Sequence, residues 1–332
     1  MSTQSFYADA VLFDMDGTLT DSIAAVEAAW GKVATDIGQD PAYVIAATHG
    51  KRAIDNLAQF KPHIKAHEMD REVQSFEESI LFFADAFKTH GPGSRRGSFS
   101  ESAVDSEFST PSLTPGSSAP SSRSSSFAFS ESSRRPSFVT RLSSALMMSA
   151  VPETEVLNTE FEDFAIEDEL IQQKTMIHQL EAWQLEAAAV NRSVRILPGV
   201  KKMISSIPAG RYAVATSGAK TYAYGCMTRV GITPPPVTIT ADDKRLKAGK
   251  PAPDPFLLAA ECLGYDAKNC VVFEDSPSGI RAGVASGATV IAVCTSHERS
   301  KIENCGAHFI VENMEKVKCD VVDGQLKFTI LA

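Results

Sequence analysis

The sequence lacks the features that would place this chain in a membrane or in an oxidising compartment. No stretch approaches the roughly 20 apolar residues of a bilayer span, and residues 1–10 contain no basic segment followed by an apolar one. Its six cysteines form no C-x-x-C pair and have no His at zinc-ligand spacing. We therefore expect a cytoplasmic protein with reduced thiols, of which Cys262, Cys270 and Cys294 are buried in apolar surroundings.

An excess of positive charge is also missing. The 332 residues carry 32 Lys plus Arg against 41 Asp plus Glu, a formal net charge of -9, and 43% of them are hydrophobic. A chain without a global basic field does not gather phosphate backbones or anionic lipid headgroups. The composition predicts a globular protein with a sizeable core, and it disfavours nucleic acid and membrane surfaces as partners.

Residues 91–150 differ from the rest, because 21 of these 60 residues are Ser, 6 are Arg and none is Lys. With so little periodic apolar content, the segment is predicted to be a disordered Ser/Arg-rich insert. Within it, Arg95-Arg96-Gly97-Ser98 and Arg134-Arg135-Pro136-Ser137 each place two arginines before a serine that Phe follows. This spacing resembles substrates of basophilic kinases, although such a composition also produces the pattern by chance. Phosphorylation of Ser98 and Ser137, and a phosphoserine reader as partner, are therefore hypotheses.

The remaining sequence alternates short apolar runs with helical periods. Residues 10–13 form an apolar run that ends in acidic residues and Gly17, as expected of a buried parallel strand. Apolar residues at steps of three and four then predict an amphipathic helix: Ile23, Val26, Trp30, Val33 and Ile37. A similar pattern over residues 166–187 predicts another helix.

From residue 211 onward, predicted strands alternate with helices. The strands are expected at residues 212–215, 237–240, 271–273, 290–293 and 308–311. This alternation predicts an α/β fold with a doubly wound parallel (Rossmann-like) sheet, whose ligand site lies beyond the carboxyl ends of the strands. The helices between the first two strands then form an inserted α-helical cap. We predict a catalytic core of residues 8–20 plus 196–332, a cap of residues 21–90 plus 151–195, and the disordered insert at 91–150.

Four polar segments lie where the strands of such a sheet converge. They are Asp14-Met15-Asp16, Thr216-Ser217, Lys250 and Glu274-Asp275. Each segment alone is also typical of a turn or a solvated surface. Their joint order, each in its local context, is the specific signal.

The segments around these residues resemble the four motifs of the haloacid dehalogenase superfamily: Phe13-Asp14-Met15-Asp16-Gly17-Thr18-Leu19, Val214-Ala215-Thr216-Ser217-Gly218, Gly249-Lys250-Pro251-Ala252-Pro253-Asp254 and Val272-Phe273-Glu274-Asp275-Ser276-Pro277-Ser278-Gly279. Within it, the chain is similar to the fungal glycerol-3-phosphate and 2-deoxyglucose-6-phosphate phosphatases over about residues 10–90 and 160–330. The resemblance implies a phosphoric monoester hydrolase. A small phosphorylated polyol or sugar is the expected partner, because a cap over the strand ends would exclude large substrates.

The resemblance also suggests roles for the polar residues. Asp14 is placed to form an aspartyl-phosphate, and Asp16 to protonate the leaving group and then activate water. Mg²⁺ would offset the repulsion between carboxylates and phosphate. Its expected ligands are Asp14, the carbonyl of Asp16, Asp275 and the nearby Glu274.

Donors for the phosphoryl oxygens are expected from the second and third motifs. They are the hydroxyl of Thr216, the amides of Ser217 and Gly218, and the charge of Lys250. Gly17 and Gly218 are expected to let the backbone approach the phosphate.

One loop of the cap is the candidate substrate-facing segment. In Thr48-His49-Gly50-Lys51-Arg52, His49 and Arg52 carry hydrogen-bonding groups, and Gly50 allows close approach to a substrate. A solvated turn between two helices is the alternative interpretation of this loop.

Two other functions stay open. An acid at Asp16 disfavours halide displacement, because superfamily dehalogenases lack it, but a sugar-phosphate mutase of the β-phosphoglucomutase type shares Asp14 and Asp16. Such mutases have a His on the first cap helix where this chain has Val26, which favours the phosphatase. The other alternative is a regulatory, non-catalytic relative that acts through its phosphorylatable insert.

Overall fold

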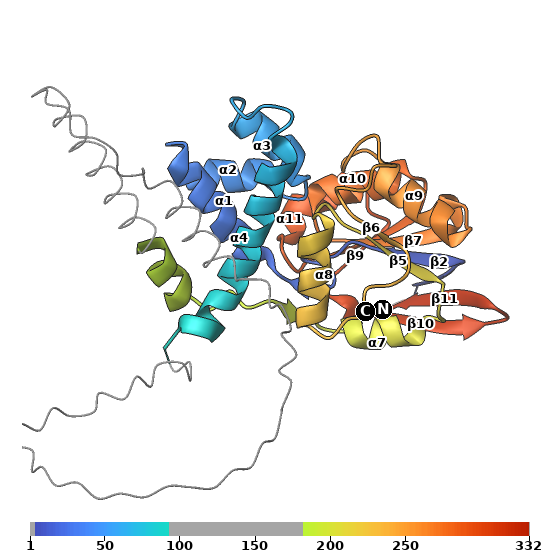
Figure 1. The fold of residues 1–332 in the computed structure, drawn as a ribbon. Helices are drawn as coiled ribbons and strands as arrows, with labels where there is room; N and C mark the ends of the chain where they lie inside the picture. Colours follow the sequence, from blue (N-terminus) through green and yellow to red (C-terminus); the bar gives the residue numbers. More distant parts are fainter. Residues whose placement is uncertain (1–3, 93–181, 332) are drawn as a thin grey trace, which may run out of the picture. The chain divides into compact units, whose positions relative to one another are not determined.

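The computed structural model describes residues 4–92 and 182–331 (Figure 1). Most of the helix predicted over 166–187 lies outside these residues, and only its last part is described, as a helix over 182–189. Residues 93–150 of the Ser/Arg-rich insert, including Ser98 and Ser137, also lie outside the described residues.

The central sheet has six parallel strands, as predicted. Its strands are β2 (Ala10–Phe13), β5 (Tyr212–Ala215), β6 (Thr238–Ile239), β7 (Cys270–Glu274), β8 (Thr289–Val293) and β9 (Phe309–Val311). They lie in the order β6-β5-β2-β7-β8-β9, which is the 3-2-1-4-5-6 order of a doubly wound sheet. The strand order reverses at β2, so the carboxyl end of β2 is the expected place for a ligand site.

Both faces of this sheet are covered, which explains why its strands read as continuous apolar runs. Along β2, Val11 and Phe13 belong to one buried cluster, and Ala10 and Leu12 belong to another. Helices α9 (Asp254–Leu263) and α10 (Pro277–Ala285) contribute to the second cluster. Helices α7 (Val200–Ser206) and α8 (Lys220–Arg229) contribute to the first. The short helical segments are α11 (Arg299–Ile302), η1 (Ala267–Asn269), η2 (Glu303–Cys305) and η3 (Met314–Lys316).

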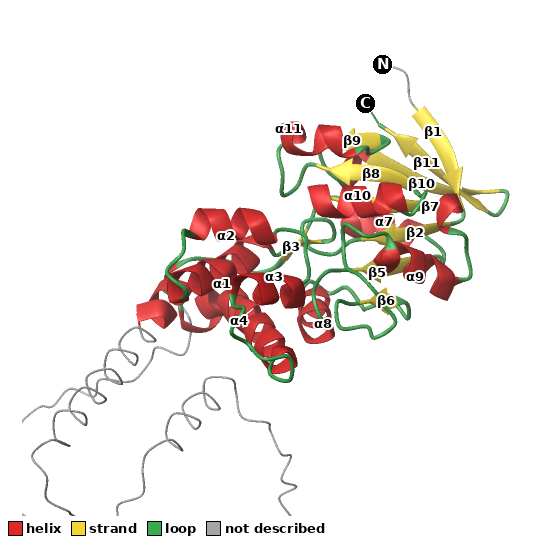
Figure 2. Cartoon of the chain, turned by 90° about the horizontal axis from the view of Figure 1, so that it is seen from above, coloured by secondary structure: helices red, strands yellow, loops and turns green. Residues whose placement is uncertain are grey.

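A second, antiparallel sheet was not predicted from the sequence. It has the order β1-β11-β10 and consists of β1 (Gln4–Ala8), β10 (Val317–Val322) and β11 (Gln325–Ile330) (Figure 2). The ring of Phe328 in β11 lies 5.3 Å from that of Phe6 and 6.2 Å from that of Phe273 in β7. This sheet therefore covers part of the first cluster with aromatic side chains.

The helical cap is inserted between two short paired strands, β3 (Thr20–Asp21) and β4 (Arg195–Ile196). Its described helices are α1 (Ile23–Asp36), α2 (Pro41–Thr48), α3 (Ala53–Phe60) and α4 (Met69–His90). Trp30 of α1 packs against Phe76 of α4, with ring centroids 4.1 Å apart. The prediction of an inserted α-helical cap is confirmed.

The predicted burial of the cysteines is only partly right. All six are free, and Cys270 is buried, but Cys262 is exposed and Cys294 is half-buried. Cys262 lies two residues after Ala260, which α9 turns toward the sheet, so its side chain points to the opposite side of the helix.

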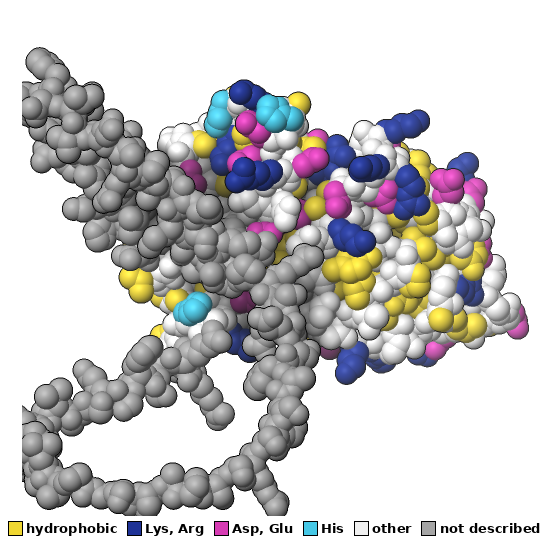
Figure 3. Space-filling model, viewed as in Figure 1, with side chains coloured by type: hydrophobic (Ala, Val, Ile, Leu, Met, Phe, Trp, Pro, Cys, Tyr) yellow, Lys and Arg dark blue, Asp and Glu magenta, His cyan; other side chains and the backbone are white. Residues whose placement is uncertain are grey.

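The described surface carries both signs of charge. Acidic and basic side chains are interspersed over the face shown in Figure 3. Among the described helices, none is long and apolar enough to cross a membrane.

Candidate active site

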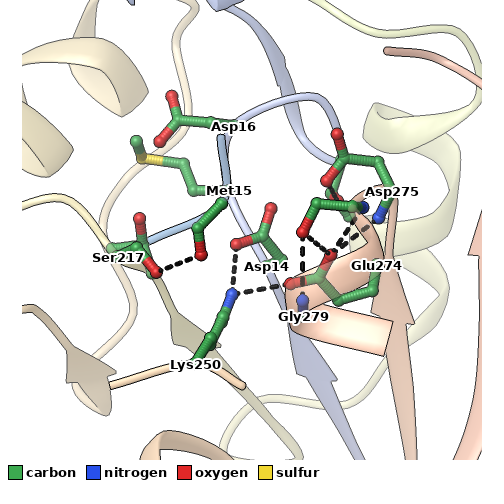
Figure 4. A network of polar contacts seen from close by, with 12 residues as sticks. Asp14, Met15, Asp16, Ser217, Lys250, Glu274, Asp275 and Gly279 are labelled. Atoms are coloured by element: carbon green, nitrogen blue, oxygen red, sulfur yellow. Dashed lines mark hydrogen bonds and ion pairs between the residues drawn. The ribbon is translucent and has the colours of Figure 1, made fainter. Parts of the chain in front are cut away.

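Side chains from separate motifs meet at the carboxyl end of the central sheet (Figure 4). Asp14 directly follows β2, Thr216 follows β5, and Glu274 is the last residue of β7. Lys250 comes from the loop before α9. The topology thus brings together residues that lie far apart in the sequence, as predicted.

A lysine lies between two carboxylates at the centre of this group. The Nζ of Lys250 donates to Oδ1 of Asp14 at 2.5 Å and to Oε1 of Glu274 at 2.7 Å. All three side chains are buried, with at most 6% of each residue exposed. Because buried charges are stable only when they are paired and hydrogen-bonded, this arrangement fixes the position of Asp14.

Burial is the largest single influence on the pKa values of Asp14, Lys250 and Asp275. It raises the pKa of Asp14 to about 7, against the opposing charge of Lys250. Burial disfavours the charge of Lys250, but Asp14 and Glu274 overcome that effect and raise its pKa above the ordinary value. The pKa of Asp275 is well above its ordinary value, first through burial and then through the neighbouring charges of Glu274 and Asp14.

The carboxylates fit a hard cation. Asp14, Glu274 and Asp275 each offer an oxygen, and these oxygens lie within 4.8 Å of one another. The Oδ2 of Asp14 is buried and has no hydrogen-bond partner among the described residues. A buried carboxylate oxygen without a donor is costly, and an oxygen-seeking ion such as Mg²⁺ would satisfy it.

Glu274 also accepts hydrogen bonds from the turn that follows β7. Its Oε2 accepts hydrogen bonds from the amides of Asp275 and Ser276, both at 2.9 Å, and from the Ser276 hydroxyl at 3.1 Å. Since Lys250 binds the other oxygen, Glu274 holds the turn after β7 and the lysine in place. Asp14 and Asp275 are therefore the better carboxylate candidates for a metal.

Asp16 lies apart from the lysine, and its side chain points away from it (Figure 4). Its Oδ1 accepts hydrogen bonds from the hydroxyl of Tyr222, at 2.5 Å, and from that of Ser22. Burial raises the pKa of Asp16, and both hydroxyls oppose this. The sequence reasoning missed both donors, because neither belongs to the four motifs.

Two donor groups of the second motif form hydrogen bonds within the protein. The hydroxyl of Thr216 accepts a hydrogen bond from the amide of Gly218 at 3.0 Å. Ser217 donates its hydroxyl to the carbonyl of Gly50, at 3.1 Å, which ties the core to the cap loop.

The structure gives the two motif glycines a steric reason that differs from the predicted one. Gly17 has a φ of +75°, and a Cβ there would lie 2.1 Å from Oδ2 of Asp275. A Cβ on Gly218 would lie 2.5 Å from the ring of Tyr222. Both glycines thus make room for neighbouring side chains of the site, whereas the sequence suggested room for phosphate.

The candidate cap loop is only partly directed at the site. His49 and Gly50 line the cavity, and the ring of His49 lies 4.8 Å from that of His297. Burial lowers the pKa of His49 to about 4, and its Nε2 has no partner among the described residues. Arg52 instead forms an ion pair with Asp55 at 2.8 Å and is not one of the cavity-lining residues.

The cavity above the strand ends is small and mostly apolar on its cap side. Its volume is about 70 Å³. The core contributes Asp14, Asp16 and Asp275, and the cap contributes Ile23, Val26, Trp30, Phe76 and Ile80. The first helix's predicted apolar stripe thus serves the cavity as well as the packing of the cap.

The cap also places a buried acid beside the cavity that the sequence reasoning missed. Glu77 of α4 accepts a hydrogen bond at Oε1 from the amide of Ala219, 2.5 Å away, where α8 begins. Burial raises the pKa of Glu77 to about 8. The available signal was an acid next to Phe76, on the buried side of an amphipathic helix.

Several relatives of this chain are named as phosphatases of small molecules. The chain is 34% identical over 152 residues to glycerol-1-phosphate phosphohydrolase 2 of Saccharomyces cerevisiae, which covers 43% of this chain and 59% of that protein. The chain thus spans about three fifths of this relative's length. It is 24% identical over 321 residues to 2-deoxyglucose-6-phosphate phosphatase 1 of the same yeast, which covers 94% of this chain and 90% of the relative.

Solved structures and a family profile agree with these matches. The fold is similar to that of a hydrolase from Pseudomonas syringae, with a TM-score of 0.51 and 16% identity over 92% of this chain and 93% of that one. The profile described as "Hydrolase: haloacid dehalogenase-like hydrolase" matches residues 8–287, more than half of the chain. The predicted resemblance is confirmed, and this chain belongs to the haloacid dehalogenase-like hydrolase family.

Proposed function

We propose that this protein is a Mg²⁺-dependent phosphatase of small polyol or sugar phosphates that works through an aspartyl-phosphate. The observation that carries the proposal is the Asp14 carboxylate, buried at the end of β2 with Lys250 on one oxygen and no described partner on the other. The related yeast proteins, named for glycerol phosphate and 2-deoxyglucose 6-phosphate, support the substrate class.

In the first step, an oxygen of Asp14 attacks phosphorus while the bond from phosphorus to the leaving oxygen breaks. Asp16 gives a proton to that oxygen, so the polyol leaves as a neutral alcohol. Lys250 holds the nucleophile through its hydrogen bond to Asp14, and its positive charge partly neutralises the negative charge of the phosphoryl group.

In the second step, a water molecule attacks the aspartyl-phosphate. Asp16, now ionised, takes a proton from this water, and the bond between phosphorus and the Asp14 oxygen breaks. Inorganic phosphate leaves, Asp14 is regenerated and Asp16 is again protonated. The amides of the turn after β5, at Ser217 and Gly218, are the proposed donors to the phosphoryl oxygens, and Gly218 exchanges its hydrogen bond with Thr216 for one to the phosphoryl group.

The metal-binding residues in this proposal are Asp14, the carbonyl of Asp16 and Asp275, with Glu274 as a buried neighbour. A bound divalent cation neutralises charge between the carboxylates and the phosphate. The chain's own residues hold the nucleophile and move the protons.

The cavity favours a compact substrate body. Its cap side is mostly apolar, and its polar lining includes Glu27, Lys51, His49, whose pKa burial lowers to about 4, and Glu77, whose pKa burial raises to about 8. At about 70 Å³ it is far below the roughly 300–1,000 Å³ of drug-sized pockets, so a compact polyol or sugar fits the proposal best. Val26 lines this cavity, and an aliphatic side chain there cannot donate the proton that a mutase histidine would.

A phosphate-release assay with a substrate panel tests the proposal. We expect hydrolysis of glycerol phosphates, 2-deoxyglucose 6-phosphate or hexose phosphates in Mg²⁺ and none after EDTA treatment. Asp14→Asn should retain less than about a tenth of the activity, because an amide is not a nucleophile for phosphorus. Asp36→Asn, which changes an exposed acid of α1, is the control. Interconversion of hexose phosphate isomers without phosphate release would favour a mutase.

Three sequence predictions stay predictions. They are the division into core, cap and insert, the cytoplasmic location, and the phosphorylation of Ser98 and Ser137 with its kinase and reader partners.

A further inference from the structure

We propose that Tyr222 is a positioning residue that orients Asp16 for proton transfer to poor leaving groups. The inference rests on the proposed phosphatase function, because it assigns Asp16 the role of general acid and base. Tyr222 belongs to the first turn of α8, outside the four motifs, and only 2% of it is exposed.

Two hydroxyls fix one oxygen of Asp16. Tyr222 donates to Oδ1 at 2.5 Å, and Ser22, at the entrance to α1, donates to the same atom. Ser22 in turn lies 3.2 Å from the hydroxyl of Thr20. The donors therefore approach Asp16 from both the core and the root of the cap.

This arrangement decides where the acid proton resides. An oxygen that accepts two hydrogen bonds is a poor place for the carboxyl proton, so the proton stays on Oδ2. In the first step, Oδ2 of Asp16 loses this proton to the leaving oxygen as the bond from phosphorus to that oxygen breaks. In the second step, Oδ2 regains a proton from water. Tyr222 keeps its own proton throughout, so it acts through Asp16 and is not itself a catalytic residue.

The protein holds the tyrosine in this position from two sides. Gly218 leaves space for its ring, because a Cβ there would lie 2.5 Å from Cδ1 of Tyr222. Glu77 of the cap accepts a hydrogen bond from the amide of Ala219, 2.5 Å away, which anchors the start of α8. The Tyr222 hydroxyl has the Asp16 carboxylate as its only hydrogen-bond acceptor among the described contacts. A phenylalanine could fill the same space, so replacing Tyr222 by Phe removes this hydrogen bond and keeps the packing of the ring.

The test compares two leaving groups in Tyr222→Phe. Glycerol phosphate releases an alkoxide that needs an acid, whereas p-nitrophenyl phosphate releases a stable phenolate that needs little help. We expect kcat on glycerol phosphate to fall roughly 10- to 100-fold, and kcat on p-nitrophenyl phosphate to change less than about threefold. KM for both substrates should stay within about threefold of the parent value.

Tyr224→Phe is the matched control, because Tyr224 lies on the same helix and contacts Lys220 instead. An equal fall on both substrates would assign Tyr222 a packing role and overturn the inference, and so would unchanged activity on both. If the parent protein hydrolyses neither substrate, the proposed function itself fails.

A second measurement protects the test against a folding defect. Ser22→Ala removes the other donor to Oδ1 and should show the same preference for the good leaving group, with a fall of about 10-fold on glycerol phosphate. In an Asp16→Asn background, Tyr222→Phe should have no further effect, because the group it orients no longer transfers protons. Additive losses would overturn the inference.

Discussion

The floor and the roof of the cavity are built from opposite kinds of side chain. The floor consists of buried ionisable side chains at the strand ends: Lys250 pairs with Asp14 and Glu274, and Asp275 lies beside them. The roof consists mainly of apolar side chains from the cap: Ile23, Val26, Trp30, Phe76 and Ile80. A paired charge in the interior fixes one geometry, whereas an apolar wall excludes water and tolerates different substrate bodies.

This difference separates two tasks. The floor follows from the parallel sheet, because β2 and β7 pair in register and end side by side. The roof follows from helices that are inserted in the chain after the first motif. The floor is thus expected to control the rate of phosphoryl transfer, and the roof to control which substrate is accepted.

The largest effect should come from removing the cation of the floor. Lys250→Ala leaves Asp14 and Glu274 buried and facing each other without compensation. We expect the free energy of unfolding to fall by about 3–5 kcal/mol, as for other broken buried ion pairs. Turnover should fall at least about 10²-fold. Urea denaturation and phosphate release measure both effects, with Lys201→Ala on the exposed side of α7 as the control. A loss of stability below about 1 kcal/mol would show that the floor tolerates an unpaired charge.

A subtler change should damage the floor without removing a charge. Gly17→Ala and Gly210→Ala both place a side chain at positive φ, +75° and +79°, and this backbone strain alone should cost each variant about 1–2 kcal/mol of stability. Only at Gly17 would the new Cβ collide with the Asp275 carboxylate, 2.1 Å away, whereas at Gly210 nothing lies within 4 Å. We expect activity to fall about 10²-fold in Gly17→Ala alone, because a small displacement of the side chains around the reacting group lowers the rate steeply. Equal activities of the two variants would contradict this.

The floor could be predicted from the sequence because its residues flank strands. An apolar run that ends in Asp14, or in Glu274 and Asp275, marks both the strand and its polar end. The place of Tyr222 could not be predicted, because it lies within a helix outside the four motifs. The apolar neighbours of Glu77 indicated its burial, but only the contact between α4 and α8 brings it to the cavity.

The antiparallel sheet was missed for a different reason. Its strands alternate buried and exposed residues, and the hairpin between β10 and β11 turns at Asp323-Gly324, with φ values of 49° and 80°. Asp-Gly between alternating strands is a known hairpin signal, so this element was available in the sequence. The strands of this sheet lie outside the four motifs in the sequence, so the motifs gave no indication of it.

Glu77, the buried acid of α4 that lines the roof, should make the stability of the protein depend on pH. Burial raises the pKa of Glu77 to about 8, and the charges of Asp242 and Asp16 act in the same direction. The folded state therefore holds a proton that the unfolded chain loses above its ordinary pKa, so stability should fall as pH rises from 5 to 8. Glu77→Gln removes this pH dependence. Between pH 5 and pH 8, the free energy of unfolding of the variant should therefore rise by up to about 4 kcal/mol relative to that of the parent. Urea denaturation at both pH values measures this, with Glu78→Gln as control. A constant difference between parent and variant would contradict the raised pKa.

The smallest effect is expected from an apolar side chain of the roof that lines the cavity and contributes little to the packing of the cap. Val26 and Val33 lie on the same stripe of α1, but Val26 lines the cavity and Val33 is buried in the cap. Val33→Ala should cost about 1–2 kcal/mol of stability and leave the preference among substrates unchanged. Val26→Ala should cost little stability and change the ratio of kcat/KM between a glycerol phosphate and a hexose phosphate by up to about tenfold, because small apolar contacts discriminate weakly. Parallel unfolding curves and substrate panels separate the two results. If Val26→Ala lowered kcat for every substrate equally, the roof would share the task of the floor.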